Sequence, residues 1–175
     1  MKTKHVLILM KIISWIIFIG LCIKAGALII SSCVSLFVNH EAAKDLYLGL
    51  DLSNLYEYDK WYFIAVISLI ISIAVLKAYM FYLVIKIFLK FDLKNPFTLN
   101  TANLISKISY VALSIGVIAI ISNDYNKWLI THRVETHILF DFGAEGVLFM
   151  AGILFIVSYI FKHGVKLQSE NELTI

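Results

Sequence analysis

Four long apolar segments, separated by shorter polar connections, dominate the pattern of residues along the chain. They cover roughly residues 6–38, 61–89, 102–122 and 144–161. A helix needs about 20 mostly apolar residues to cross a bilayer, and these segments are of that order or longer. Because lipid offers the backbone no hydrogen-bonding partners, each segment is expected to be an α-helix. The pattern predicts one integral membrane domain over residues 1–175, an all-α bundle of four transmembrane helices.

The charged residues set the expected orientation of these helices. They make up 15% of the chain, compared with about 25% in ordinary soluble domains. Nine lysines lie in the amino-terminal flank, the second connection and the carboxyl tail, whereas the first and third connections hold four lysines and arginines. The positive-inside rule therefore predicts that both termini and the second connection lie in the cytoplasm, with the lipid bilayer as the surrounding partner. No basic tract suggests direct binding of nucleic acid.

The first and third connections, which are expected on the opposite side, alternate between apolar and polar residues. The alternation runs through residues 45–52 and again through residues 133–142. A period of two, with β-branched and aromatic residues, is typical of strands. Because both segments leave the membrane on the same side, they could pair as a small extracytoplasmic β-cap over the bundle. An amphipathic surface helix or a plain loop is the alternative interpretation.

The second connection contains the only proline of the chain, in the sequence Asn95, Pro96, Phe97 and Thr98. Proline disfavours helical backbone for the residue before it, so the preceding helix is expected to end by Asn95. Thr98 can cap the next helix, since its hydroxyl can accept from N–H groups of the first turn; Asn100 is the competing cap. The four residues predict a turn between two helices, but a turn does not require an apolar ring at Phe97.

Three charged residues fall within or at the edge of the apolar segments: Lys24, Lys77 and Glu145. A charge at the bilayer centre costs at least about 2.5–3.5 kcal/mol, so such residues are candidates for function. Their expected depths place Lys24 and Glu145 toward the outer side and Lys77 toward the inner side. Lys24 and Glu145 are therefore the better ion pair. The alternative is that each lysine extends its stem independently toward the headgroups.

A metal site and a catalytic site both receive little support from the sequence. His137, Asp141 and Glu145 are spaced four residues apart, so on a helix they would line one face with metal-binding groups. On a strand, four residues span about 13 Å, and no ion could touch both His137 and Asp141. The chain contains none of the common hydrolase or metalloprotease motifs. We therefore expect no metal, no cofactor and no enzymatic activity.

Two short motifs stand out, the turn at Asn95, Pro96, Phe97 and Thr98 and a polar segment that closes the chain after Gly164. Together they resemble the signature of the bacterial domain-of-unknown-function family numbered 2975. The first is Asn95, Pro96, Phe97 and Thr98, followed by Ile108 in the next helix. The second closes the chain, and its members are Gly164, Leu167, Gln168, Glu170, Glu172, Leu173, Thr174 and Ile175. The resemblance covers essentially the whole chain. It implies a four-helix, multi-pass protein of the bacterial cytoplasmic (inner) membrane, without known enzymatic activity. Members are often encoded beside a small helix-turn-helix regulator, which implies a small cytoplasmic transcription regulator as a partner.

These patterns together predict a non-enzymatic membrane protein of regulation or interaction. Its cytoplasmic surface would combine the turn with the tail, that is, Asn95, Pro96, Phe97 and Thr98 with Gly164, Glu170, Glu172 and Leu173. A second copy of the chain is another partner that this surface could bind, giving a homo-oligomer. The alternative function is a small transporter, or a binder of a lipid or apolar ligand, in which Lys24, Lys77 and Glu145 line a polar path.

Overall fold

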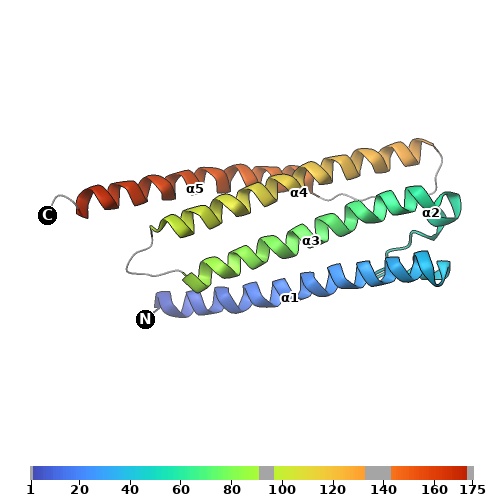
Figure 1. The fold of residues 1–175 in the computed structure, drawn as a ribbon, viewed down its shortest axis with the longest axis horizontal. Helices are drawn as coiled ribbons and strands as arrows, with labels where there is room; N and C mark the ends of the chain where they lie inside the picture. The colour runs from blue at the N-terminus through green and yellow to red at the C-terminus, as the bar shows by residue number, and fades with distance from the viewer. Residues whose placement is uncertain (1, 91–96, 133–142, 173–175) are drawn as a thin grey trace.

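The computed structural model describes residues 2–90, 97–132 and 143–172, which are helical apart from short connections (Figure 1). The four long helices are α1 (Lys2–Phe37), α3 (Lys60–Lys90), α4 (Leu99–Thr131) and α5 (Ala144–Glu172). Each is long and apolar enough to cross a membrane, which confirms the predicted number and type of transmembrane segments. Two short helices, the 3-10 helix η1 (His40–Lys44) and α2 (Ser53–Tyr58), lie between α1 and α3.

The long helices pack in the order of the chain. α1 contacts α3, α3 contacts α4, and α4 contacts α5, so the four form a row that runs from bottom to top in Figure 1. Among the described residues, no Cα atom of α1 lies within 8 Å of a Cα atom of α5. The bundle is therefore open rather than closed into a ring. Both termini lie at the same end of the row, as expected for an even number of antiparallel helices.

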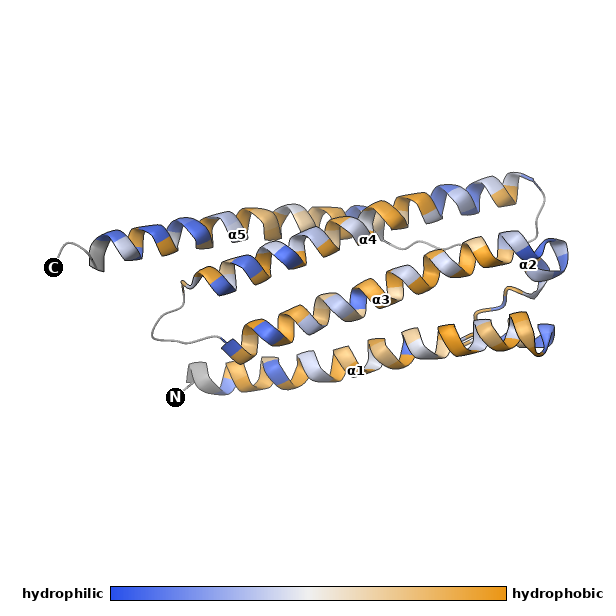
Figure 2. Ribbon diagram, viewed as in Figure 1, coloured by the Kyte–Doolittle hydropathy of each residue, from blue (hydrophilic) through white to orange (hydrophobic). Residues whose placement is uncertain are grey.

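The far end of α5 differs from the rest of the row. Figure 2 shows that α1 and α3 are hydrophobic along most of their length, whereas polar residues gather in the last turns of α5. The apolar segment ends near Phe161, but the helix continues to Glu172, a further distance of about 16 Å at 1.5 Å per residue. In Figure 1 this end protrudes beyond the start of α4 and the N-terminal end of α1. We call residues 162–172 the α5 extension.

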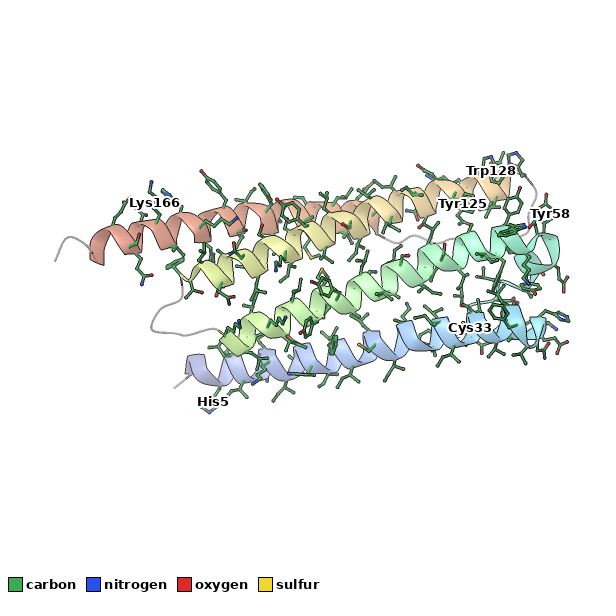
Figure 3. All side chains as sticks on the ribbon, viewed as in Figure 1. His5, Cys33, Tyr58, Tyr125, Trp128 and Lys166 are labelled. Atoms are coloured by element: carbon green, nitrogen blue, oxygen red, sulfur yellow. The ribbon has the colours of Figure 1, made fainter. Side chains whose placement is uncertain are left out.

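The opposite end of the row is marked by aromatic side chains. The rings of Tyr125 and Trp128 stack with centroids 6.0 Å apart, and Tyr62 of α3 meets Trp128 edge-on at 5.8 Å. Tyr58 stacks on Tyr62 at 5.9 Å. Figure 3 shows Tyr58, Tyr125 and Trp128 at this end, far from Lys166 on the α5 extension. Tyrosine and tryptophan are enriched where membrane helices pass the headgroup level, so a cluster of this composition is typical of a membrane boundary.

The connection between α1 and α3 corrects the prediction of a β-cap. Residues 45–52 form no strand; the chain instead reverses at Leu48 and Gly49, whose φ angles are 49° and 82°. The reversal is closed by the backbone N–H of Leu46, which donates to the carbonyl of Leu50 at 2.9 Å. Leu46 and Leu52 are buried against the helices. Leu46 and Leu52 therefore anchor a folded loop and do not belong to a strand. The second expected strand, residues 133–142, lies outside the described residues.

Candidate functional site

The ring of Phe97, directly before α4, packs against α5. Its centroid lies 5.2 Å from that of Phe161. The same ring lies over Gly164, where an added Cβ atom would stand 2.8 Å from Cδ1 of Phe97. That is closer than real Cβ contacts, so a side chain at 164 would displace the ring. The two motifs singled out in the sequence therefore meet in space. We call Phe97, Phe161 and Gly164 the hinge–tail junction.

The position of Phe97 is fixed by the cap that starts α4. The hydroxyl oxygen of Thr98 accepts a hydrogen bond from the backbone N–H of Thr101 at 3.1 Å, and the two threonine hydroxyls lie 2.8 Å apart. The predicted N-cap is thereby confirmed, in preference to Asn100. Phe97 lies immediately before this cap and therefore outside α4. Asn95 and Pro96 lie outside the described residues.

The seam between α4 and α5 holds the junction in register. The hydroxyl of Ser109 donates to the carbonyl of Ala151 at 2.9 Å, and the hydroxyl of Ser158 donates back to the carbonyl of Ala102 at 3.2 Å. Both hydroxyls are buried. Serine hydroxyls and small residues are typical of closely packed membrane helices.

A glycine adds to this close packing. A Cβ atom at Gly116 would collide with the side chain of Leu148. The two helices therefore approach each other closely along their shared length, and α5 has little freedom to slide along α4.

The α5 extension presents a mixed polar and apolar surface. Lys166 pairs with Glu170 at 3.8 Å, one helical turn apart, and both side chains are exposed. Leu167, which lies between them, is 49% exposed. The backbone of Glu172 ends the helix, and Leu173 lies outside the described residues. Two of the predicted tail residues therefore have contacts in the structure: Gly164 lies against Phe97, and Glu170 forms an ion pair with Lys166.

Residues 47–175 match the family model described as protein of unknown function (DUF2975). The chain belongs to the DUF2975 family. The matched segment contains the hinge–tail junction and the helices α3, α4 and α5, and it begins after α1. The resemblance therefore covers less of the chain than the motifs suggested, since the first transmembrane helix lies outside it. No curated protein and no solved structure shows a significant match to the chain.

The intramembrane charged residues do not come together as a set of three. Glu145 opens α5, which makes no contact with α1, the helix that carries Lys24. Instead Glu145 borders a cavity of about 480 Å³ together with Asp124 and Lys127 of α4. Neither Lys24 nor Lys77 lines this cavity. The helix arrangement gives the proposed ion pair of Lys24 and Glu145 no support.

Lys24 and Lys77 are instead neighbours across the seam of α1 and α3. The rings of Phe18 and Tyr82 fix the register of these antiparallel helices, with centroids 6.1 Å apart. Lys24 comes six residues after Phe18 on α1. Because α3 runs in the opposite direction, the matching position on α3 is six residues before Tyr82, at residue 76, next to Lys77. This register places Lys24 and Lys77 at nearly the same level of the two helices. The different depths expected for the two lysines came from each helix end taken separately, and the register between the helices places them closer in level than that expectation did.

The metal hypothesis concerned the third connection. His137 and Asp141 lie outside the described residues, so it stays an interpretation of the sequence. Within residues 5–90, 97–132 and 143–170, the structure brings together no group of three histidine, cysteine, aspartate or glutamate side chains that could hold a metal ion.

Proposed function

We propose that this DUF2975 protein is a non-enzymatic membrane interaction protein that presents the α5 extension to a cytoplasmic partner. The observation that carries the proposal is the hinge–tail junction. Phe97 packs on Gly164 and Phe161 at the point where α5 leaves its apolar segment. The junction ties the base of a protruding polar helix to the start of α4, so the extension has a defined direction.

The cytoplasmic placement rests on charge. The junction lies at the same end of the row as both termini (Figure 1). Lys86 and Lys90 near the end of α3 and Lys162 and Lys166 on the α5 extension share this end with the amino-terminal lysines. Positive charge of this kind is retained on the cytoplasmic side of bacterial inner membranes. The aromatic cluster at the other end would then mark the extracytoplasmic boundary.

The chemistry of the α5 extension favours a protein partner. Exposed Leu167 is flanked by Lys166 and Glu170, which bear opposite charges. An apolar contact surrounded by charged groups is a common arrangement at transient protein interfaces. A small helix-turn-helix regulator is the partner that the family resemblance implies. The extension would hold such a regulator at the membrane and away from its other binding sites.

A photo-crosslinking amino acid at position 167 of the full-length chain tests this proposal in living bacteria. We expect a crosslinked product containing a soluble cytoplasmic protein, identified by mass spectrometry. The matched control places the crosslinker at Ile156, which is 60% exposed on the apolar part of the same helix. That position should give lipid adducts alone. A product of twice the chain mass would identify a second copy as the partner, and absence of any protein adduct at 167 would refute the proposal.

The orientation has its own test. Ser169→Cys adds a thiol on the α5 extension, whereas the native cysteines Cys22 and Cys33 lie on α1 within its apolar span. A membrane-impermeant maleimide should label Ser169→Cys after the cells are permeabilised and leave it unlabelled in intact spheroplasts. Labelling in intact spheroplasts would place the junction on the outer face and exclude a cytoplasmic partner.

The transporter alternative gains no comparable support. A polar path through Lys24, Lys77 and Glu145 would need α1 and α5 to share a surface, and they make no contact within the described residues. The lysines are considered separately below, because their arrangement with each other leads to a different conclusion.

A further inference from the structure

The seam between α1 and α3 brings two lysines together inside the apolar part of the protein. Lys77 lies 13 residues from Lys90 and 17 residues from Lys60, the two ends of α3. At 1.5 Å per residue these separations are about 20 Å and 26 Å. A lysine stem reaches only part of that distance, so the amino group of Lys77 remains within the membrane-spanning part of α3.

The two lysines share one edge of the seam. Each residue along a helix turns by 100°, so Ala25 and Leu28 point between the directions of Phe18 and Lys24 on α1. On α3, Ala74 and Ala78 point between the directions of Tyr82 and Lys77 in the same way. These four alanine and leucine side chains are buried.

The contact of Phe18 with Tyr82 occupies one edge of this buried strip. Lys24 and Lys77 therefore occupy the other edge, at nearly the same level. Lys24 is exposed there and Lys77 is half-buried, so the pair opens laterally toward lipid.

No negative charge on these helices balances the pair. Neither α1 nor α3 contains an aspartate or glutamate. Across the described part of the chain, no carboxylate lies within ion-pair distance of either lysine. Lys86, by contrast, has a partner, since its amino group lies 4.5 Å from the centre of the Tyr82 ring. Two like charges side by side in a low-dielectric medium repel each other strongly, and each already costs energy to bury.

We infer that Lys24 and Lys77 bind the acidic head of a lipid amphiphile at the lateral opening of the α1–α3 seam. One anionic group between the two ammonium groups removes their repulsion and forms charge-assisted hydrogen bonds to both. The apolar surface of α1, much of which is exposed, accommodates the acyl chain. Two sources supply this chemistry: the phosphate of an anionic phospholipid and the carboxylate of a long-chain fatty acid. The site lies at the other side of the row from α5, so it is independent of the hinge–tail junction.

Native mass spectrometry of the full-length chain tests this site. The protein is released from vesicles of dioleoylphosphatidylcholine that contain either dioleoylphosphatidylglycerol or oleate. We expect retention of the anionic species over phosphatidylcholine, and the two vesicle compositions show whether phosphate or carboxylate is preferred. The double variant Lys24→Gln, Lys77→Gln should lose at least about tenfold in affinity for that species, from two contacts of about 1 kcal/mol each.

Two further variants keep the test decisive. Lys24→Glu creates an internal ion pair with Lys77, so it should insert and fold normally yet lose the bound anion. Lys107→Gln removes a lysine from α4, outside the pair, and should leave retention unchanged. Equal retention of anionic species and phosphatidylcholine by the wild type, or undiminished retention by Lys24→Glu, would overturn the inference.

Discussion

The α4–α5 seam and the α1–α3 seam use serine in opposite ways. In α4–α5, Ser109 and Ser158 each donate a hydrogen bond to a carbonyl of the other helix. In α1–α3, the hydroxyls of Ser14 and Ser32 bond to carbonyls of their own helix, and the buried hydroxyl of Ser35 has no hydrogen-bond partner among the described residues. The same residue type therefore joins two helices in one seam and only fills space in the other.

This difference indicates that the packing of α4 against α5 is more tightly constrained than the packing of α1 against α3. α4 and α5 approach each other closely at Gly116, the ring of Phe97 lies over Gly164, and both glycines lie in the segment that matches DUF2975. α1 lies outside that segment, and little of its apolar surface is buried by the protein. The α4–α5 hairpin is thus a rigid support for the α5 extension, whereas α1 leaves most of its surface to lipid.

The largest effect is expected from Gly116→Ala. The added methyl collides with Leu148, and overpacking of this kind costs about 1–3 kcal/mol. The free energy of unfolding is measured by circular dichroism in mixed micelles with increasing denaturing detergent. Leu148→Ala in the same chain should recover part of the loss. Gly152→Ala is the control, since no atom lies within 4 Å of its added Cβ; equal costs at 116 and 152 would show that the close approach is absent.

A smaller effect distinguishes the two seams directly. Ser109→Ala removes an interhelical hydrogen bond, and such bonds contribute about 0.6 kcal/mol on average and up to about 1.7 kcal/mol. Ser35→Ala removes a buried hydroxyl without a partner, so it should be neutral or stabilising. The same detergent unfolding assay measures both. If Ser35→Ala costs as much as Ser109→Ala, the contrast between the seams is wrong.

The most local effect is expected at the start of α4. Thr98→Ala removes the N-cap, which is worth about 1 kcal/mol, and should increase amide hydrogen exchange in the first turn of α4. Thr131→Ala, at the other end of α4, removes a hydroxyl that bonds to the carbonyl of Lys127 within the helix. It should leave exchange in the first turn as it is in the wild type. Unchanged exchange in Thr98→Ala would mean that Thr98 does not set the start of the helix.

Hydropathy and local chemistry predicted the elements well because both act within one segment. The apolar segments became α1, α3, α4 and α5, and Thr98 caps α4 as its position next to the turn indicated. The helix ends were underestimated at α4, which continues from the predicted end near Ser122 to Thr131. An apolar segment indicates only the part of a helix that suits lipid, whereas the hydrogen bonding of the helix backbone continues into the polar residues that follow.

The contacts between helices could not be predicted in the same way. The contact of Phe97 with Gly164 and the common level of Lys24 and Lys77 depend on the register and rotation of packed helices. No single-segment pattern encodes these quantities. The failed strand at 45–52 has a related cause, since Leu46 and Leu52 are buried against neighbouring helices, whereas Leu48 between them is exposed. A turn alone did not explain why residue 97 is a phenylalanine. Its ring packs against Gly164, which lies 67 positions away in the sequence.

The central claim is that the hinge–tail junction directs the α5 extension toward its partner. The most direct measurement is the yield of the crosslink from position 167 in Phe97→Ala, Gly164→Ala and the double variant. Each single variant should reduce the yield several-fold, the double variant should be no worse than either, and Gly152→Ala should match the wild type. A yield that is unchanged by Phe97→Ala, at equal protein levels in the membrane, would contradict the claim.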